Sequence, residues 1–135
     1  MRTLHNIDLK NNESGFTLRW QDRLILSHSA DAPCLWIGAG EADIEMFRGN
    51  FSIKDKLNEK IALTNATVTQ QSTGWAIRFT RGDAVSATLL VGMDAEGRLE
   101  LKLKNDAASH NRIWLRLAAQ PDDHIYGCGE QFSYF

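Results

Sequence analysis

The sequence lacks the features that would place it outside ordinary globular proteins. Its 135 residues include only two cysteines, Cys34 and Cys128, which are too few for a disulfide framework and favour a reduced, cytoplasmic location. A single bridge between them is the less favoured alternative. The 15 basic and 17 acidic residues give a net charge of -2, without the basic excess of a nucleic-acid-binding protein. No apolar run approaches the roughly 20 residues of a membrane span, and no apolar stretch marks a secretion signal.

Recognisable catalytic and cofactor motifs are also missing. The sequence has no Gly-x-Ser-x-Gly element, and residues 38–43 carry Asp where a dinucleotide loop needs its third glycine, so we interpret them as a turn between strands. His124 and Cys128 could ligate a metal with His110 or Cys34, but their spacing matches no zinc signature. We therefore predict neither a metal nor a cofactor.

Alternation of apolar and polar residues is the strongest pattern present. It predicts half-buried strands at 16–20, 75–81, 99–104 and 112–117. In the last run Ile113, Leu115 and Leu117 are expected to face inward. Trp114 then faces outward, which predicts that something covers this face. A turn at 93–98 predicts that 85–91 and 99–103 pair as a hairpin.

The spacing of these signals predicts about nine or ten strands, more than one ordinary sheet usually holds. We expect one all-β domain over residues 1–135, an antiparallel β-sandwich of two packed sheets. One segment is ambiguous, because Ile53, Leu57 and Ile61 have helical spacing. We favour strand there, since the β-branched residues of 61–69 follow directly.

Acidic residues alternate along 41–45. On a strand, Asp43 and Glu45 would project from one face about 6.6 Å apart at the backbone. Such a separation is accessible to the two carboxylates of a glycosidase. The favoured interpretation is a solvated strand face. Its opposite, buried face would then hold Ala42, Ile44 and Met46.

The C-terminal end is unusually aromatic, with three aromatic residues in the last four, and predicts a cut within a longer chain. Just before it, Gly127 and Gly129 permit a close backbone approach. Such a loop could line a sugar pocket, or it could be a tight bend with a packed aromatic tail. The polar and aromatic side chains that would line the pocket are Glu130, Gln131 and Phe132.

Residues 125–132 resemble the tyrosine–glycine–x–glycine–glutamate segment near the end of the N-terminal β-domain in glycoside hydrolase family 31, the α-glucosidase family. Residues 33–38 and 46–56 are similar to the sulfoquinovosidase branch of that family. The likeness extends from about residue 16 to residue 135.

This resemblance implies a galactose-mutarotase-like β-sandwich that precedes a (β/α)8 barrel. The barrel carries the catalytic aspartates of a retaining α-glycosidase, and in this branch it also holds the 6-sulfonate of the sugar. No catalytic residue is then expected in this chain. Its partners would be the barrel of the same polypeptide and the α-glycoside. The 126–132 loop, with Gly127, Gly129, Glu130, Gln131 and Phe132, would contribute to the pocket rim, and the isolated piece would associate through exposed apolar surface.

Other functions stay open from the residues alone. A free-standing carbohydrate-binding module would need an aromatic platform, for which Trp36, Trp114 and Tyr134 are candidates. A mutarotase-like enzyme would need an acid and a base, for which His124 and Glu130 are candidates. The domain could equally belong to a plain α-glucosidase.

Overall fold

The chain is all β, as predicted. The computed structural model describes residues 6–83 and 85–126, and within these ranges it contains strands and turns but no helix. The strands are β1 (Ile7–Asn12), β2 (Gly15–Trp20), β3 (Arg23–Ser29), β4 (Leu35–Phe47), β5 (Asn50–Ala62), β6 (Asn65–Gln71), β7 (Gly74–Arg81), β8 (Val85–Met93), β9 (Leu99–Asn105) and β10 (Arg112–Leu115).

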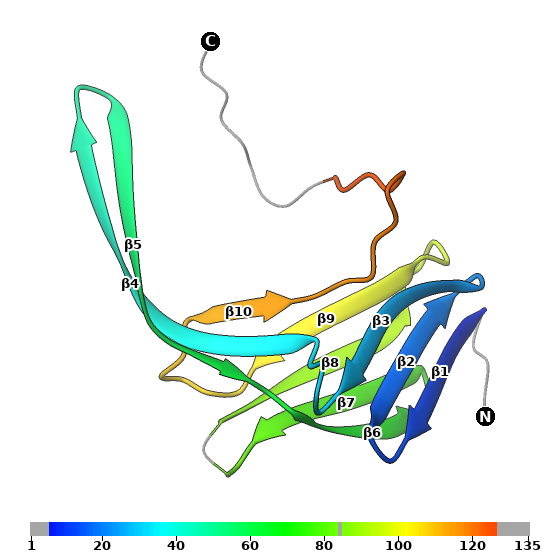
Figure 1. Ribbon diagram of the computed structural model, residues 1–135. Helices are drawn as coiled ribbons and strands as arrows, with labels where there is room; N and C mark the ends of the chain where they lie inside the picture. The colour runs from blue at the N-terminus through cyan, green and yellow to red at the C-terminus, as the bar shows by residue number, and fades with distance from the viewer. Residues whose placement is uncertain (1–5, 84, 127–135) are drawn as a thin grey trace.

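The strands form three antiparallel sheets. The N-terminal sheet has the order β1-β2-β3, the central sheet β6-β7-β8-β9, and the arm sheet β10-β4-β5. Figure 1 shows β4 and β5 of the arm sheet extending into a long hairpin that rises well beyond the other described strands. The segment after β10 rises on the same side.

The core lies where the N-terminal and central sheets meet. The rings of Phe16 on β2, His28 on β3 and Phe79 on β7 pack together, with centroids 5.2 to 5.9 Å apart. Alternation correctly predicted the inward faces of β2 and β7, because every second residue of a strand points to the same side. The largest fully buried side chains are Ile7, Phe16, Leu18, Leu26, Cys34, Leu35, Ile37, Leu63, Ile77, Phe79 and Leu89.

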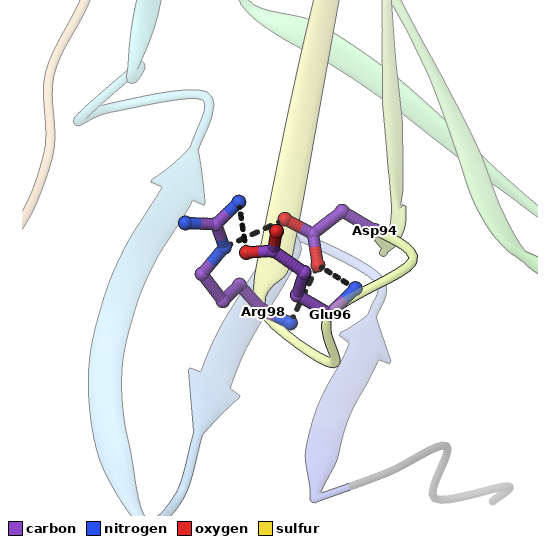
Figure 2. A network of polar contacts seen from close by, with 3 residues as sticks. All are labelled: Asp94, Glu96 and Arg98. Atoms are coloured by element: carbon purple, nitrogen blue, oxygen red, sulfur yellow. Dashed lines mark hydrogen bonds and ion pairs between the residues drawn. The ribbon is translucent and has the colours of Figure 1, made fainter.

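The predicted hairpin between β8 and β9 is confirmed, and Met93 pairs with Leu99 at its end. Asp94 organises the turn (Figure 2): its Oδ1 accepts hydrogen bonds from the backbone N–H groups of Glu96 and Arg98, each at 2.9 Å, and its Oδ2 accepts one from Arg98 Nε at 2.8 Å. The backbone and side-chain hydrogen bonds from Arg98 lower the pKa of Asp94. Gly97 takes the left-handed conformation that the turn requires, with φ 80°.

The ambiguous segment 53–61 is strand, so its helical spacing is misleading. It belongs to β5, which pairs with β4 along its whole length. The two strands are joined at Arg48 and Gly49, whose φ angles are 50° and 80°. Two left-handed residues in a two-residue turn are the type I′ geometry that matches the twist of an antiparallel pair. The geometry of this turn therefore favours the antiparallel pairing of β4 with β5.

The prediction of a turn at 38–43 is wrong. These residues run through the middle of β4, with a bulge between Ala39 and Gly40. Gly38 is needed for packing: a Cβ there would lie 2.3 Å from the Glu59 carbonyl oxygen and 2.9 Å from the Trp114 ring. The glycines of this stretch therefore leave room for neighbouring backbone and side-chain atoms to approach β4 closely within the sheet.

The prediction for 112–117 is correct only in part. β10 ends at Leu115, Ile113 is 39% exposed and Leu117 49% exposed. The reason is position, because β10 is an edge strand that pairs with β4 alone among the strands described. Ile113 pairs with the buried Ile37 but lies at the sheet margin.

Candidate functional site

The segment that leads to the predicted rim loop is anchored on the sandwich. The backbone N–H of Arg116 donates to the Cys34 carbonyl at 2.8 Å, and that of Ala118 donates to the Ile25 carbonyl at 2.8 Å. Asp123 forms an ion pair with Arg23 and also accepts from the backbone N–H of Gln120 at 2.7 Å. These bonds hold residues 116–123 against β3 and the start of β4.

A hollow of about 440 Å³ lies between this segment and the N-terminal sheet. Apolar side chains form most of its wall, with the Arg23–Asp123 pair at its margin. The residues that line it are Trp20, Arg23, Ile25, Leu115, Leu117, Ala118, Ala119, Asp123, His124 and Ile125. The hollow therefore borders the described end of the segment that continues into the predicted rim.

The predicted rim residues Gly127, Gly129, Glu130, Gln131 and Phe132 lie outside the described residues. So do Cys128 and Tyr134, which the metal and carbohydrate-platform hypotheses used. The last described residues, Ile125 and Tyr126, are 75% and 86% exposed. The rim assignment stays a prediction.

The acidic residues of β4 face basic or polar partners across the hairpin. Glu41 is in register with Lys56, Asp43 with Lys54, and Glu45 with Ser52. Directly opposed side chains on an antiparallel pair lie on the same face. The acids are therefore part of a charged ladder on an exposed ribbon. This confirms the favoured interpretation that they lie on a solvated strand face.

The other half of that interpretation is wrong, because the opposite face is not buried. Ile44 is 60% exposed and Met46 68% exposed, and Ala42 is exposed as well. Ile53, which pairs with Ile44, is 65% exposed. The physical reason is that this part of the hairpin extends past the sandwich, so no other described strand reaches it (Figure 1).

The two tryptophans proposed as a sugar platform are paired and covered by cations. Trp36 and Trp114 are in register on β4 and β10, and both are half-buried. Lys60 Nζ lies 4.7 Å from the Trp114 ring centroid and 5.5 Å from that of Trp36. Arg116 lies 5.8 Å from Trp36. Side chains of the chain itself therefore supply the predicted cover over Trp114, through cation–π contacts.

A buried histidine and a buried cysteine lie close together, but not as a catalytic pair. His28 Nδ1 accepts a hydrogen bond from the Cys34 backbone N–H at 3.2 Å, and Nε2 donates to the Thr64 carbonyl at 3.0 Å. Burial is the main cause that lowers the pKa of His28, and burial raises the pKa of the Cys34 thiol to about 11. A neutral imidazole and a protonated thiol are structural groups of the core.

The described residues contain no group of three or more His, Cys, Asp or Glu side chains arranged to hold a metal ion. His110 instead contacts Glu59 Oε2 through Nε2 at 3.1 Å, which joins the loop before β10 to β5. Over the same residues, no helix is long and apolar enough to cross a membrane.

Comparison with known proteins gives a consistent result. No family model matches the chain. It is 70% identical over 126 residues to the sulfoquinovosidase of Escherichia coli K12, and 38% identical over 130 residues to that of Agrobacterium fabrum. These alignments cover 93% and 91% of the chain. The chain is similar to an N-terminal domain of a family 31 sulfoquinovosidase.

A solved structure agrees with this result. A family 31 sulfoquinovosidase from E. rectale, in complex with an aza-sugar inhibitor, matches with a TM-score of 0.70 and 32% identity over 95% of the chain. The chain spans about 18% of the length of each of these sulfoquinovosidases. The predicted resemblance and the sandwich fold are thus confirmed.

Proposed function

We propose that the chain is the non-catalytic N-terminal β-domain of a retaining α-glycosidase that hydrolyses α-sulfoquinovosides. The observation that carries the proposal is the 70% identity to a sulfoquinovosidase over nearly the whole chain. The charged ladder between β4 and β5 supports the non-catalytic part of the proposal, because Glu41, Asp43 and Glu45 are each opposed by a lysine or a serine. In this role the domain buttresses a catalytic barrel that supplies the nucleophile and the general acid.

The substrate class is tested with the full-length polypeptide. Its kcat/KM is measured on nitrophenyl α-sulfoquinovoside and on nitrophenyl α-glucoside. We expect a strong preference for the sulfonated sugar. Equal rates, or a preference for the glucoside, would assign the domain to a plain α-glucosidase instead.

The second part of the proposal is that the 126–132 loop contributes to the rim of the sugar pocket. The anchored segment 116–123 supports this, since it fixes where the loop begins. We expect Glu130→Ala or Gln131→Ala in the full-length enzyme to lower kcat/KM. Glu96→Ala in the β8–β9 turn, an exposed acid outside the loop, is the matched control. Unchanged kinetics in both loop variants would reduce the loop to a packing role.

The free-standing carbohydrate-binding module is less well supported. Its platform would need bare aromatic faces, whereas Lys60 and Arg116 lie over the two described tryptophans. The cytoplasmic location and the self-association of the isolated piece stay predictions.

A further inference from the structure

The hairpin of β4 and β5 changes its buried side part-way along. At its base, Leu35 and Ile37 face the core and are fully buried. Beyond the bulge at Ala39 and Gly40 the same side of β4 carries Glu41, and the apolar residues move to the opposite side. A strand keeps one side apolar only where that side is to be covered. The switch therefore marks a second surface built for contact, on the side facing away from the core.

We call residues 40–57 the arm, and the side with the apolar residues its outer face. The register places the two partners of each pair on the same side of the ribbon, so the apolar side chains of β4 and β5 form one stripe along the outer face. All are exposed, from 45% to 68%. The large apolar residues of the outer face are Ile44, Met46, Phe51, Ile53 and Leu57, and the pair of Ala42 with Asp55 lies on the same side between Leu57 and Ile53.

Side chains of Asn111 and Arg112 fix the base of the arm. The side chain of Asn111 forms two hydrogen bonds with Gly40. Its Oδ1 accepts from the Gly40 N–H at 3.0 Å, and its Nδ2 donates to the Gly40 carbonyl at 2.9 Å. Arg112 Nη2 binds Asp55 Oδ1 at 2.6 Å. The segment before and within β10 thus braces both strands of the arm. Past this point only the ladder between the two strands holds it, and an isolated two-stranded ribbon is marginally stable in water.

The size of the outer face helps to distinguish two possible partners, a second copy of this chain and another domain of the same polypeptide. A fully buried aliphatic side chain removes roughly 100 Å² from water, so five that are partly covered already would bury roughly 300 Å². A stable dimer needs about 800 Å² from each partner. Contacts between domains of one chain begin at about 600 Å² in total, or about 300 Å² a side. The apolar side chains of the outer face alone fall well short of a dimer's share and reach the lower end of a contact between domains of one chain, which favours a domain on the same polypeptide.

We propose that the outer face of the arm docks on the catalytic portion of the same polypeptide. The relatives are about five times as long as this chain, which spans 18% of them, so a large partner is joined to the domain covalently in those proteins. A covalently joined partner is present at high effective concentration, and a small apolar contact then suffices. The inference rests on the proposed function only in taking that portion as the partner.

The test uses hydrogen exchange in the full-length polypeptide, read on the arm amides between residues 42 and 55. The variant Ile44→Ser/Ile53→Ser removes the central apolar pair. The matched control, Asp43→Ser/Lys54→Ser, removes the adjacent pair on the charged side. Exchange in β7 and β8 reports whether the sandwich is intact in each variant. The mass in solution is measured in parallel by light scattering.

We expect the apolar variant to exchange at least about tenfold faster in the arm than wild type, with the mass and the β7–β8 amides unchanged. The charged-face control is expected to match wild type. Equal exchange in the two variants would overturn the proposal. A wild-type dimer that becomes monomeric in the apolar variant would overturn it in favour of a second copy. These readouts need no substrate, so they stay separate from the kinetic test of the proposed function.

Discussion

His28 allows the sharpest test of how the core is built. The residue is 3% exposed, and its two ring nitrogens form hydrogen bonds with the Cys34 N–H and the Thr64 carbonyl. The substitution His28→Phe keeps a ring between Phe16 and Phe79 but leaves these two backbone groups without a partner. Each buried polar group left unpaired costs about 1–3 kcal/mol, so with two such groups we expect a loss of roughly 2–6 kcal/mol in the free energy of unfolding at pH 7.

The pH dependence of that loss identifies its cause. Burial lowers the pKa of His28 in the folded state, so the unfolded chain binds the proton more readily. The contribution of neutral His28 to the free energy of unfolding is therefore fully present above the unfolded pKa of about 6.5. It falls as the pH drops below that value, by at most about 1.4 kcal/mol per pH unit for one proton. The Phe variant lacks this contribution, so its deficit relative to wild type should shrink between pH 7 and pH 5.

Urea unfolding of the 135-residue domain at several pH values measures both effects. His124→Gln is the control, because it removes a histidine that is exposed rather than buried in the core. A deficit that stays constant from pH 7 to pH 5 would refute the reasoning. So would a Phe variant as stable as wild type.

Three further predictions concern the same domain. Ile77→Ala should cost about 2–5 kcal/mol in urea unfolding because Ile77 is fully buried, whereas Ile44→Ala on the exposed arm should stay within about 0.5 kcal/mol; similar costs would contradict the assigned burial. In a Cys128→Ser background, iodoacetamide should label Cys34 at least about 100-fold more slowly in the folded than in the unfolded chain, and rapid labelling would show an accessible thiol. Asp94→Ala should destabilise the domain more than Asp94→Asn, since asparagine keeps an acceptor oxygen for the turn amides. The carboxylate's contribution should vanish as the pH falls through its lowered pKa, and equal effects of the two variants at pH 7 would count against the turn network.

Local signals predicted the sandwich well. Alternation placed Phe16, Leu18, Ile77 and Phe79 inside because a strand with one covered face has a strict period of two. The same rule failed at Ile44, because alternation does not show whether another element reaches the apolar side of a strand, and none of the other described strands does so here. It also failed at the edge strand β10, where sheet position decides exposure.

The candidate site was less predictable, for physical reasons. The 38–43 stretch contains two glycines, which suggest a turn, but in β4 they give room to Trp114 and to neighbouring backbone. The contact of Lys60 with Trp36 and Trp114 joins three strands and depends on register, which a single sequence does not specify. The chemistry of the 126–132 loop depends on family resemblance rather than on residue pattern.

The central claim is that this domain assists a glycosidase without containing its catalytic groups. The most direct test compares hydrolysis of nitrophenyl α-sulfoquinovoside by the full-length polypeptide and by the 135-residue domain, at matched concentration and with the domain's fold checked by circular dichroism. We expect turnover by the full-length polypeptide and a rate equal to that of buffer for the domain. Turnover by the domain alone would contradict it, and would make Asp43 and Glu45 the first residues to substitute.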